Sequence, residues 1–311
     1  MNTSRCPESE PRLRRSMLMT PGNRPDRMRK AAVYGADALV LDLEDSVPAA
    51  AKVQAREAVG LALRELQGCG RELCVRINTP GSGFGADDLA ALPLALLDSV
   101  MVPKVESPAE LHQLHALLQA LEREQDVQRP RELVVMLETP RGILQALPIA
   151  DACTRTTALF FGSGDYTAAT GAAITANALL FARSAIAAAA GAVGIQAIDA
   201  AYFLDVRNAE ATRADALAAR ELGFAGKVVF HPAQVAVANE VFSPTRAELQ
   251  RAERVVAGYR QALAQGHGTA LADGVFVAID LVGPAERLLR RAALVQQRDA
   301  GSVPHPLTAS T

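Results

Sequence analysis

Short apolar runs alternate with longer segments of mixed polarity along most of the chain. Eight of these runs are apolar at nearly every position, which is typical of strands covered on both faces of a parallel sheet. The expected strands cover residues 16–20, 38–43, 72–77, 99–104, 133–139, 157–162, 197–203 and 227–232. Each is followed by a segment whose polarity pattern changes.

The segments between the runs favour helices, because their apolar residues recur at three- and four-residue spacing. The expected helices cover residues 26–34, 49–66, 87–97, 107–124, a segment ending near 152, then 176–190, 208–222 and 233–241. Eight strand-then-helix units in about 225 residues suit a closed barrel, whereas a doubly wound sheet commonly stops at five or six strands. We predict an α/β protein with a (β/α)8 TIM barrel over residues 1–242.

Residues 243–311 exceed what a barrel needs. Ser243 and Pro244 predict a helix start, since they suit the N-cap and first helical positions. A break rich in Gly and His at 266–268, an apolar run at 274–280 and a helix from Pro284 onward follow. We expect a C-terminal helical extension that packs on the barrel or on a neighbouring subunit.

Composition narrows the class of protein. A formal charge of -2, from 32 basic and 34 acidic residues, gives no field for nucleic acid. No run reaches the ~18 apolar residues of a membrane span, and the polar start lacks the apolar core of an export signal. Four cysteines are too few for a disulfide framework. We expect a cytoplasmic protein that binds neither nucleic acid nor membrane.

Two of the expected strands end in an acidic residue. Glu138 follows the apolar run that begins at Leu133, and Asp165 follows the next run along the chain. The carboxyl ends of parallel strands share one rim, so the two carboxylates should lie close together and repel. A hard divalent cation removes that repulsion, and we predict that Glu138 and Asp165 bind a metal ion.

Other charged residues are expected at the same rim. They are Asp42, Glu44 and Asp45 after the second strand, Arg76 and Asn78 after the third, and Lys104 after the fourth. For any one of them a solvated loop or a structural ion pair is the simpler interpretation. Charged or polar residues at the ends of several strands, taken together, favour a functional site.

Six segments, taken in order, carry a resemblance to a known family. They are Arg15–Gly22, Leu41–Val47 with Lys52 and Arg56, Arg76–Asn78, Leu137–Thr139, Phe161–Asp165 and Gly223–Pro232. Together they resemble the citrate lyase β-subunit-like branch of the HpcH/HpaI aldolase family. The resemblance implies a TIM barrel that binds Mg2+ and cleaves or forms a carbon–carbon bond of a 3-hydroxyacyl thioester, usually a CoA thioester of citryl, citramalyl or malyl type.

The resemblance also implies roles for individual residues. Glu138 and Asp165 would be the metal ligands and catalytic groups, and Arg76 the catalytic, substrate-binding arginine that contacts the keto acid. Arg15 and Arg24 are expected to bind the CoA phosphates. Glu44 and Asp45 are expected either to orient metal-bound waters or to pair with Lys52 and Arg56, and Lys52 is taken as a further cofactor-binding candidate.

The C-terminal extension departs from the family pattern. Relatives carry a lid aspartate in a segment that aligns here with Leu281–Ala285, and Gly283 stands where it would fall. Either Asp280 replaces it as a catalytic acid or base, or that role is lost. Because relatives cover such apolar tails across subunits, the resemblance implies a homo-oligomer, with a trimer or a multiple of it as the expected state.

Three alternative functions need to be weighed, of which the first is disfavoured and the other two stay open. The Gly-rich segment from Gly81 to Ala86 fits a relaxed dinucleotide-binding motif, but that motif belongs after the first strand of its fold. A CoA-independent class II aldolase acting on pyruvate would need the same metal pair. A non-catalytic subunit of a larger lyase complex would be consistent with Gly283.

Overall fold

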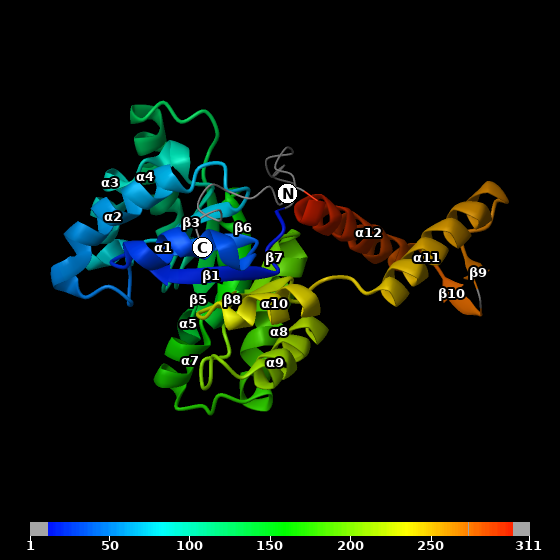
Figure 1. The fold of residues 1–311 in the computed structure, drawn as a ribbon. Helices are drawn as coiled ribbons and strands as arrows, with labels where there is room; N and C mark the ends of the chain where they lie inside the picture. Colours follow the sequence, from blue (N-terminus) through cyan, green and yellow to red (C-terminus); the bar gives the residue numbers. More distant parts are fainter. Residues whose placement is uncertain (1–11, 273, 301–311) are drawn as a thin grey trace. The chain divides into compact units, whose positions relative to one another are not determined.

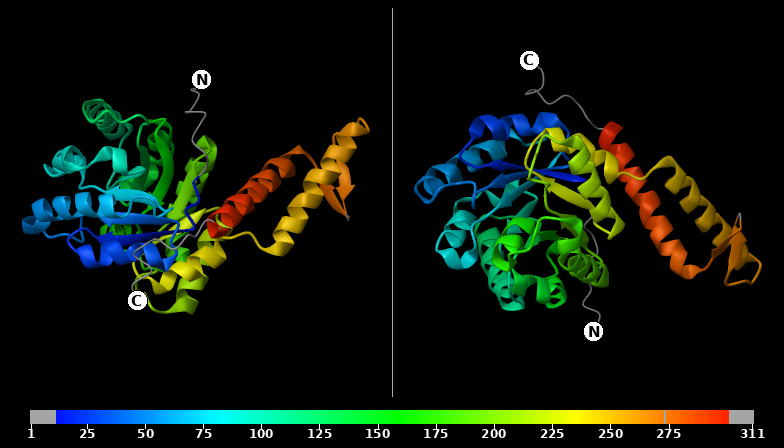
Figure 2. Two further views of the ribbon diagram at one scale, coloured as in Figure 1. Left: turned by 45° about the horizontal axis from the view of Figure 1, so that its top comes forward. Right: turned by 90° about the horizontal axis from the view of Figure 1, so that it is seen from below.

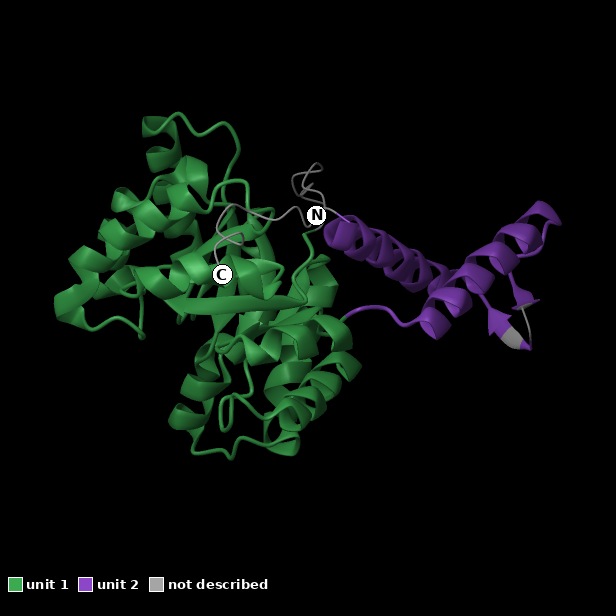
Figure 3. Ribbon diagram, in the orientation of Figure 1, with its two compact units in different colours: residues 1–242, 304–311 green, residues 243–303 purple. Residues whose placement is uncertain are grey.

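The computed structural model describes residues 12–272 and 274–300. The chain divides into two units, residues 1–242 with 304–311, and residues 243–303 (Figure 3). Residues 301–311 of the predicted extension lie outside the described part. The two units are treated one at a time below.

The first unit is a closed barrel of eight parallel strands in sequence order, in which β1 also pairs with β8. The strands are β1 Ser16–Pro21, β2 Ala38–Asp42, β3 Glu72–Arg76, β4 Ser99–Val102, β5 Glu132–Leu137, β6 Thr156–Phe161, β7 Gln196–Asp199 and β8 Gly226–Val229. Nearly every strand residue is buried, as expected of strands covered on both faces. The structure confirms the predicted (β/α)8 TIM barrel.

Helices surround the strands (Figures 1 and 2). They are α1 Pro25–Ala31, α2 Lys52–Glu65, α3 Gly85–Ala91, α4 Pro108–Glu124, α5 Pro140–Leu144, α6 Ala146–Asp151, α7 Ser163–Thr170, α8 Ala176–Val193, α9 Ala209–Glu221 and α10 Ala233–Val241. Side-chain caps fix several starts: Thr139, Thr175 and Asn208 accept backbone N–H groups at the starts of α5, α8 and α9. The sequence pattern missed α7, a short helix with almost no apolar face.

Side chains of each strand alternate between the inside of the barrel and the layer under the helices. One buried cluster inside the barrel includes Val40, Cys74, Met101, Met136 and Phe160. A larger cluster joins the opposite strand faces to the helices. Position along a strand therefore decides whether a polar residue points into the barrel or outward.

Helix α8 is long and apolar enough to cross a membrane by length and composition, the one such helix among the described residues. Its buried Arg183 donates from Nε to Asp199 Oδ1 at 3.0 Å and from Nη2 to Asp199 Oδ2 at 2.9 Å. Asp199 belongs to β7, and α8 also packs on α6 and β6. These contacts account for α8 as an outer helix of the barrel.

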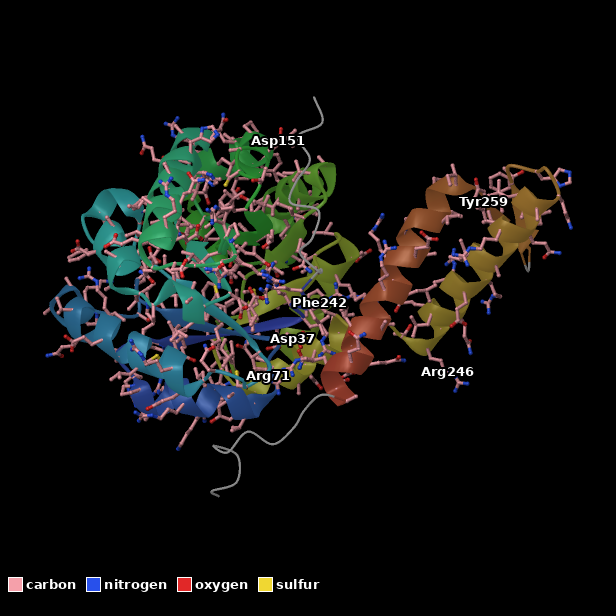
Figure 4. The ribbon with its side chains drawn as sticks, turned by 90° about the horizontal axis from the view of Figure 1, so that it is seen from above. Asp37, Arg71, Asp151, Phe242, Arg246 and Tyr259 are labelled. Carbon is pink, nitrogen blue, oxygen red and sulfur yellow. The ribbon has the colours of Figure 1, made fainter. Side chains whose placement is uncertain are left out.

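The second unit consists of two long helices and a small hairpin. The elements are α11 Arg246–Ala264, β9 Ala270–Ala272, β10 Val275–Val277 and α12 Ile279–Ala300. Thr245 and Glu248 form a reciprocal capping box at the start of α11. Tyr259 of α11 lies in the unit's own small core with Val277 (Figure 4). Helix α12 begins at Ile279 and encloses Pro284, so the predicted start at Pro284 is wrong.

Candidate active site

Charged side chains meet at the carboxyl ends of β2, β3 and β5. Asp42, Arg76 and Glu138 each lie two residues beyond an inward-facing residue, namely Val40, Cys74 and Met136. Alternation along a strand therefore points all three into the mouth of the barrel. Asp42 and Arg76 are also register partners in the β2–β3 ladder.

Arg76 is fixed by two carboxylates. Its Nε and Nη2 donate to the two oxygens of Asp42 at 2.6 and 2.8 Å, and Nη1 lies 2.9 Å from Glu44 Oε2. Burial alone would raise the pKa of Asp42, but the hydrogen bonds and charge of Arg76, together with hydrogen bonds from Ser46 and the Glu44 backbone, outweigh it and the pKa is lowered. Nη1 also lies 4.0 Å from the sulfur of Met136. A thioether sulfur is a weak acceptor, so this side of the guanidinium could still donate to a stronger acceptor.

Lys104 contacts four carboxylates around the mouth. Its backbone N–H donates to Glu138 Oε1 at 2.9 Å. Its Nζ donates to Glu44 Oε1 at 2.6 Å and lies 3.3 Å from Asp45 Oδ2 and 3.6 Å from Asp165 Oδ2. Although burial opposes the ammonium charge, these acids raise the pKa of Lys104, so it is cationic at neutral pH.

Glu138 is the most perturbed acid of the group. It is 2 % exposed, and its pKa is raised to about 8. Burial is the largest cause, and repulsion from Glu44 and Asp165 adds to it, while Arg76 and Lys104 act in the opposite sense. Among the described residues, Glu138 thus has too little positive charge nearby to be a stable carboxylate at neutral pH.

Asp165 lies in the first turn of α7. Its Oδ2 atom is buried and accepts no hydrogen bond from the described residues. The neighbouring Gly162 allows Glu138 to pack closely against the backbone, since a Cβ there would lie 2.4 Å from Glu138 Cβ and 2.6 Å from Glu138 Oε2. A buried carboxylate oxygen without a donor, in a cavity that a second carboxylate also lines, suits a divalent cation with oxygen ligands.

The excess of acidic over basic side chains in the cluster also favours binding of a cation. Ion pairs and electrostatic interactions connect five carboxylates, Asp42, Glu44, Asp45, Glu138 and Asp165, with two cations, Arg76 and Lys104. Arg27 also lines the cavity, so the acids outnumber these bases by five to three. Within residues 12–272 and 274–300, no three acidic, His or Cys side chains form a complete metal cage. An ion held by Glu138 and Asp165 alone would keep water or substrate in its other positions.

A cavity of about 490 Å3 opens at this mouth. Arg76, Glu138, Asp165, Asp45 and Ser46 line one side of it. Apolar residues line the rest, among them Met19, Met136, Phe160, Ala200, Phe203 and Phe230. A second hollow of similar volume lies between α2, α3 and α4, outside the barrel, where no comparable set of inward charges converges.

Two of the predicted cofactor-binding residues have other partners. Arg15 precedes β1, at the amino end of the barrel, where it is buried and bonds both oxygens of Asp37 at 2.9 Å. Lys52 is buried, and its Nζ donates to the carbonyls of Leu43 and Glu44 at 2.6 and 2.7 Å. Neither side chain lines the cavity, and these contacts give both a structural role; a role with the cofactor stays a prediction.

The remaining predicted residues fall into two groups. Arg76, Glu138 and Asp165 are brought together, as described above. Arg24, which follows β1, is exposed and pairs with Asp26 at 3.1 Å, so its role with CoA stays a prediction. Asp280 lies exposed in the first turn of α12 in the second unit, and its catalytic role also stays a prediction.

The sequence pattern placed Asp42 and Lys104 at the rim without finding their roles. The expected pairing of Arg56 with Glu44 or Asp45 is wrong, because Arg56 Nε donates to Asp88 Oδ1 at 2.6 Å. The inward alternation of β2 could have placed Asp42 beside Arg76. No local signal shows that Lys104 turns back toward Glu138.

Comparisons with known proteins match most of the chain. The family model described as HpcH/HpaI aldolase/citrate lyase matches residues 15–232. Citrate lyase subunit beta of Leuconostoc mesenteroides subsp. cremoris is 34% identical over 286 residues, covering 90% of this chain and 94% of that protein. The L-malyl-CoA/beta-methylmalyl-CoA lyase of Rhodobacter capsulatus is 33% identical over 312 residues, covering 93% of this chain and 98% of that protein.

A solved structure shows the same likeness. The protein CitE from Mycobacterium tuberculosis, in complex with magnesium, acetoacetate and coenzyme A, is 33% identical, with a TM-score of 0.69. The match covers 89% of this chain and 97% of that one.

Proposed function

The chain belongs to the HpcH/HpaI aldolase/citrate lyase family and is a carbon–carbon lyase, and from this premise we propose that it cleaves a 3-hydroxyacyl-CoA thioester. The products are an acyl-CoA and a keto acid, and one Mg2+ held by Glu138 and Asp165 assists the reaction. Relatives named as CoA-thioester lyases and a neighbour solved with magnesium and coenzyme A support this proposal.

The observation that carries the proposal is the unbalanced pair of carboxylates. Glu138 has its pKa raised to about 8, and Asp165 Oδ2 is buried without a hydrogen-bond donor among the described residues. One divalent cation between the two carboxylates would lower the pKa of Glu138 and give the buried oxygen of Asp165 a partner. When bound, such an ion acts as a Lewis acid toward the oxygens of the keto acid.

Cleavage requires one proton and one electron pair to move. The β-hydroxyl gives up its proton, and the bond between its carbon and the carbon next to the thioester breaks. The electron pair of that bond passes to the thioester half as an enolate, which takes a proton to become the acyl-CoA. The carbon that carried the hydroxyl leaves as the carbonyl carbon of the keto acid.

Arg76 suits the oxygen at which the new carbonyl forms. It lines the cavity, and its contacts with Asp42 and Glu44 fix the guanidinium plane before substrate arrives. A donor held in place in this way stabilises developing charge without reorganising during the reaction. The apolar wall that includes Phe203 and Phe230 excludes water from the other side of the cavity.

A direct assay tests the proposal. Purified protein with MgCl2 is incubated with citryl-CoA, citramalyl-CoA and malyl-CoA in turn, and released oxaloacetate, pyruvate or glyoxylate is measured. We expect turnover of at least one thioester and its loss in EDTA, with recovery when Mg2+ is restored. Turnover that persists in EDTA would exclude the metal assignment, and the panel identifies the thioester.

The same assay separates the alternative functions. A CoA-independent class II aldolase would condense pyruvate with an aldehyde and would leave every CoA thioester intact. A non-catalytic subunit would do neither, although it could still bind the ligands. The dinucleotide-binding alternative is excluded by the fold, because the segment from Gly81 to Ala86 connects β3 to α3 in a closed barrel.

We also propose that the working protein is a homo-oligomer in which the second unit covers a neighbouring subunit. The support is the exposed apolar surface of that unit, where Leu271, Phe276 and Ile279 are 77, 62 and 67 % exposed. Mixing Glu138→Gln chains with Asp280→Asn chains tests whether Asp280 acts across subunits, because mixed oligomers would then regain some complete sites. A monomer by light scattering would contradict the proposal.

A further inference from the structure

Lys104 has a backbone conformation that its side chain does not favour. Its φ is +54°, in the left-handed region that non-glycine residues rarely adopt. Asp126 is the other non-glycine residue with positive φ among those described, but it lies in an exposed turn, and aspartate tolerates this region well. Such a conformation persists in a lysine when its surroundings hold it there, and it is often found at functional sites.

The backbone of Lys104 orients one metal-ligand candidate. Its N–H donates to Glu138 Oε1 at 2.9 Å. The other oxygen, Oε2, lies on the side of Gly162, which lines the cavity together with Glu138. The amide therefore leaves Oε2 as the oxygen of Glu138 that is available to a ligand.

The ammonium of Lys104 orients the other acids with graded strength. It is 2.6 Å from Glu44 Oε1, 3.3 Å from Asp45 Oδ2 and 3.6 Å from Asp165 Oδ2. The first is a charge-assisted hydrogen bond, whereas the last is an ion pair beyond hydrogen-bond distance. Glu44 thus anchors the ammonium, and Asp165 can separate from it at little cost.

Lys104 does not line the cavity, although Asp45, Glu138 and Asp165 do. It therefore acts through these acids. We propose that Lys104 is a positioning residue whose backbone amide, which Met and Gly would retain, orients Glu138 toward a divalent cation, and that its ammonium competes with that cation for Asp165. This inference rests on the proposed function, because it requires metal binding at Glu138 and Asp165.

The test measures Mg2+ affinity rather than turnover. EDTA-treated full-length protein is titrated with MgCl2 by calorimetry, and its melting temperature is recorded without metal. We expect Lys104→Met, which keeps the length but removes the charge, to bind Mg2+ about tenfold more tightly, since a competing cation is gone. We also expect it to melt below the unsubstituted protein without metal, because the acids then repel one another.

Two further variants serve as controls for charge. Lys104→Arg keeps the cation and should bind Mg2+ within about threefold of the unsubstituted protein. Lys30→Met removes a lysine charge from the exposed face of α1 and should change neither affinity nor melting temperature. Equal or weaker Mg2+ binding by Lys104→Met would overturn the inference about Lys104 while leaving the proposed function intact. Failure of the unsubstituted protein to bind Mg2+ would instead overturn the metal site itself.

A glycine variant isolates the backbone contribution. Lys104→Gly lacks the ammonium, as Lys104→Met does, but glycine adopts positive φ without strain. Without metal it should melt above Lys104→Met, and it should share the tighter Mg2+ binding. If Lys104→Met does not fold, Lys104→Gly carries the affinity test. Equal melting of the two variants would contradict a strained left-handed backbone at this position.

Discussion

The two ends of the barrel are built from the same strands and use charge in opposite ways. Strand β3 carries Glu72 at its amino end and Arg76 at its carboxyl end, and β5 is followed by Glu138 and begins with Glu132. Within each strand the two positions are an even number of residues apart, so both side chains point into the barrel. The comparison is therefore between two layers of one interior.

At the amino end the two inward-facing acids, Glu72 and Glu132, share a buried arginine. The buried Arg14 donates from Nε and Nη2 to the two oxygens of Glu72 at 2.7 and 2.8 Å, and from Nη2 to Glu132 Oε2 at 2.7 Å. Ser99 Oγ donates to Glu72 Oε1 at 2.6 Å. Burial would raise the pKa of Glu72, but Arg14 outweighs it and the pKa is lowered.

At the carboxyl end the acids outnumber the bases, and the pKa of Glu138 is raised instead. The two acids are almost equally buried, so burial does not explain the difference. What differs is the supply of positive charge. A cluster with balanced charges stabilises the fold, whereas a cluster with excess acids is suited to binding an added cation, as proposed above.

The largest loss of activity is expected when Glu138, one of the two proposed metal-binding carboxylates, is replaced. Glu138→Gln keeps the shape but removes the charge that holds a divalent ion, whose Lewis acidity is worth several kcal/mol, roughly a thousandfold in rate. The metal-free variant should nonetheless be at least as stable as the unsubstituted protein at pH 8, by thermal melting. Normal turnover with an acyl-CoA would place the metal elsewhere.

The matching change at the amino end should act on stability instead. Glu72→Gln leaves Arg14 buried and without its main counter-charge, so we expect a loss of about 3 kcal/mol in the free energy of unfolding, measured with urea. Activity per folded molecule should be unchanged. Glu65→Gln is the control, because its pair with Arg29 is exposed to solvent and should contribute little to stability. Equal losses of stability in Glu72→Gln and Glu65→Gln would contradict a special stabilising role for the buried pair at the amino end.

A smaller effect is expected for Arg76→Lys. The lysine keeps the charge but loses the planar group that bonds Asp42 and Glu44 together, so the rate should fall about a hundredfold. Weaker binding of the keto acid should accompany the loss. Unchanged kinetics would assign Arg76 to structure, as at the amino end.

The smallest effect is a difference in pH dependence between the two ends. The raised pKa of Glu138 means that folding binds an extra proton, so the metal-free protein should lose stability as pH rises from about 4.5 to about 8. The lowered pKa of Glu72 stabilises the fold above about pH 4.5, and this contribution is lost as pH falls below that value. We expect melting shifts of a few degrees.

A variant and the addition of MgCl2 test whether Glu138 causes the pH-dependent change in melting temperature. Glu138→Gln should abolish the loss between pH 4.5 and 8 without affecting the loss at lower pH. MgCl2 should raise the melting temperature of the unsubstituted protein most at pH 8, where Glu138 is ionised. A flat profile in this range would contradict the raised pKa.

The barrel could be predicted from sequence because its strands are buried on both faces and therefore apolar throughout. The expected strands at 197–203 and 227–232 extended too far, since the apolar residues past β7 and β8 include Ala200, Phe203 and Phe230, which line the cavity in loops. Apolar character marks burial, and it cannot separate a strand from a cavity wall.

Sequence reasoning found the site residues that directly follow a strand. It missed the contacts that join residues from different strands. Glu138 and Arg76 were found because the carboxyl ends of parallel strands share a rim. Arg15 precedes its strand and so belongs at the opposite end, which its order in the sequence already indicates. The link from Lys104 to Glu138 depends on a left-handed residue that no pattern of polarity records.

Gly162 determines the order in which this site could change during evolution. Every single-nucleotide change that turns a glycine codon into another amino acid adds a Cβ, and that atom would lie 2.6 Å from Glu138 Oε2. A smaller side chain at position 138 would not remove the conflict, because the new atom would lie 2.4 Å from Glu138 Cβ, which every residue except glycine retains. In a descendant that gives up the metal, residue 162 can therefore vary only after residue 138 has become glycine or the backbone between the two positions has moved.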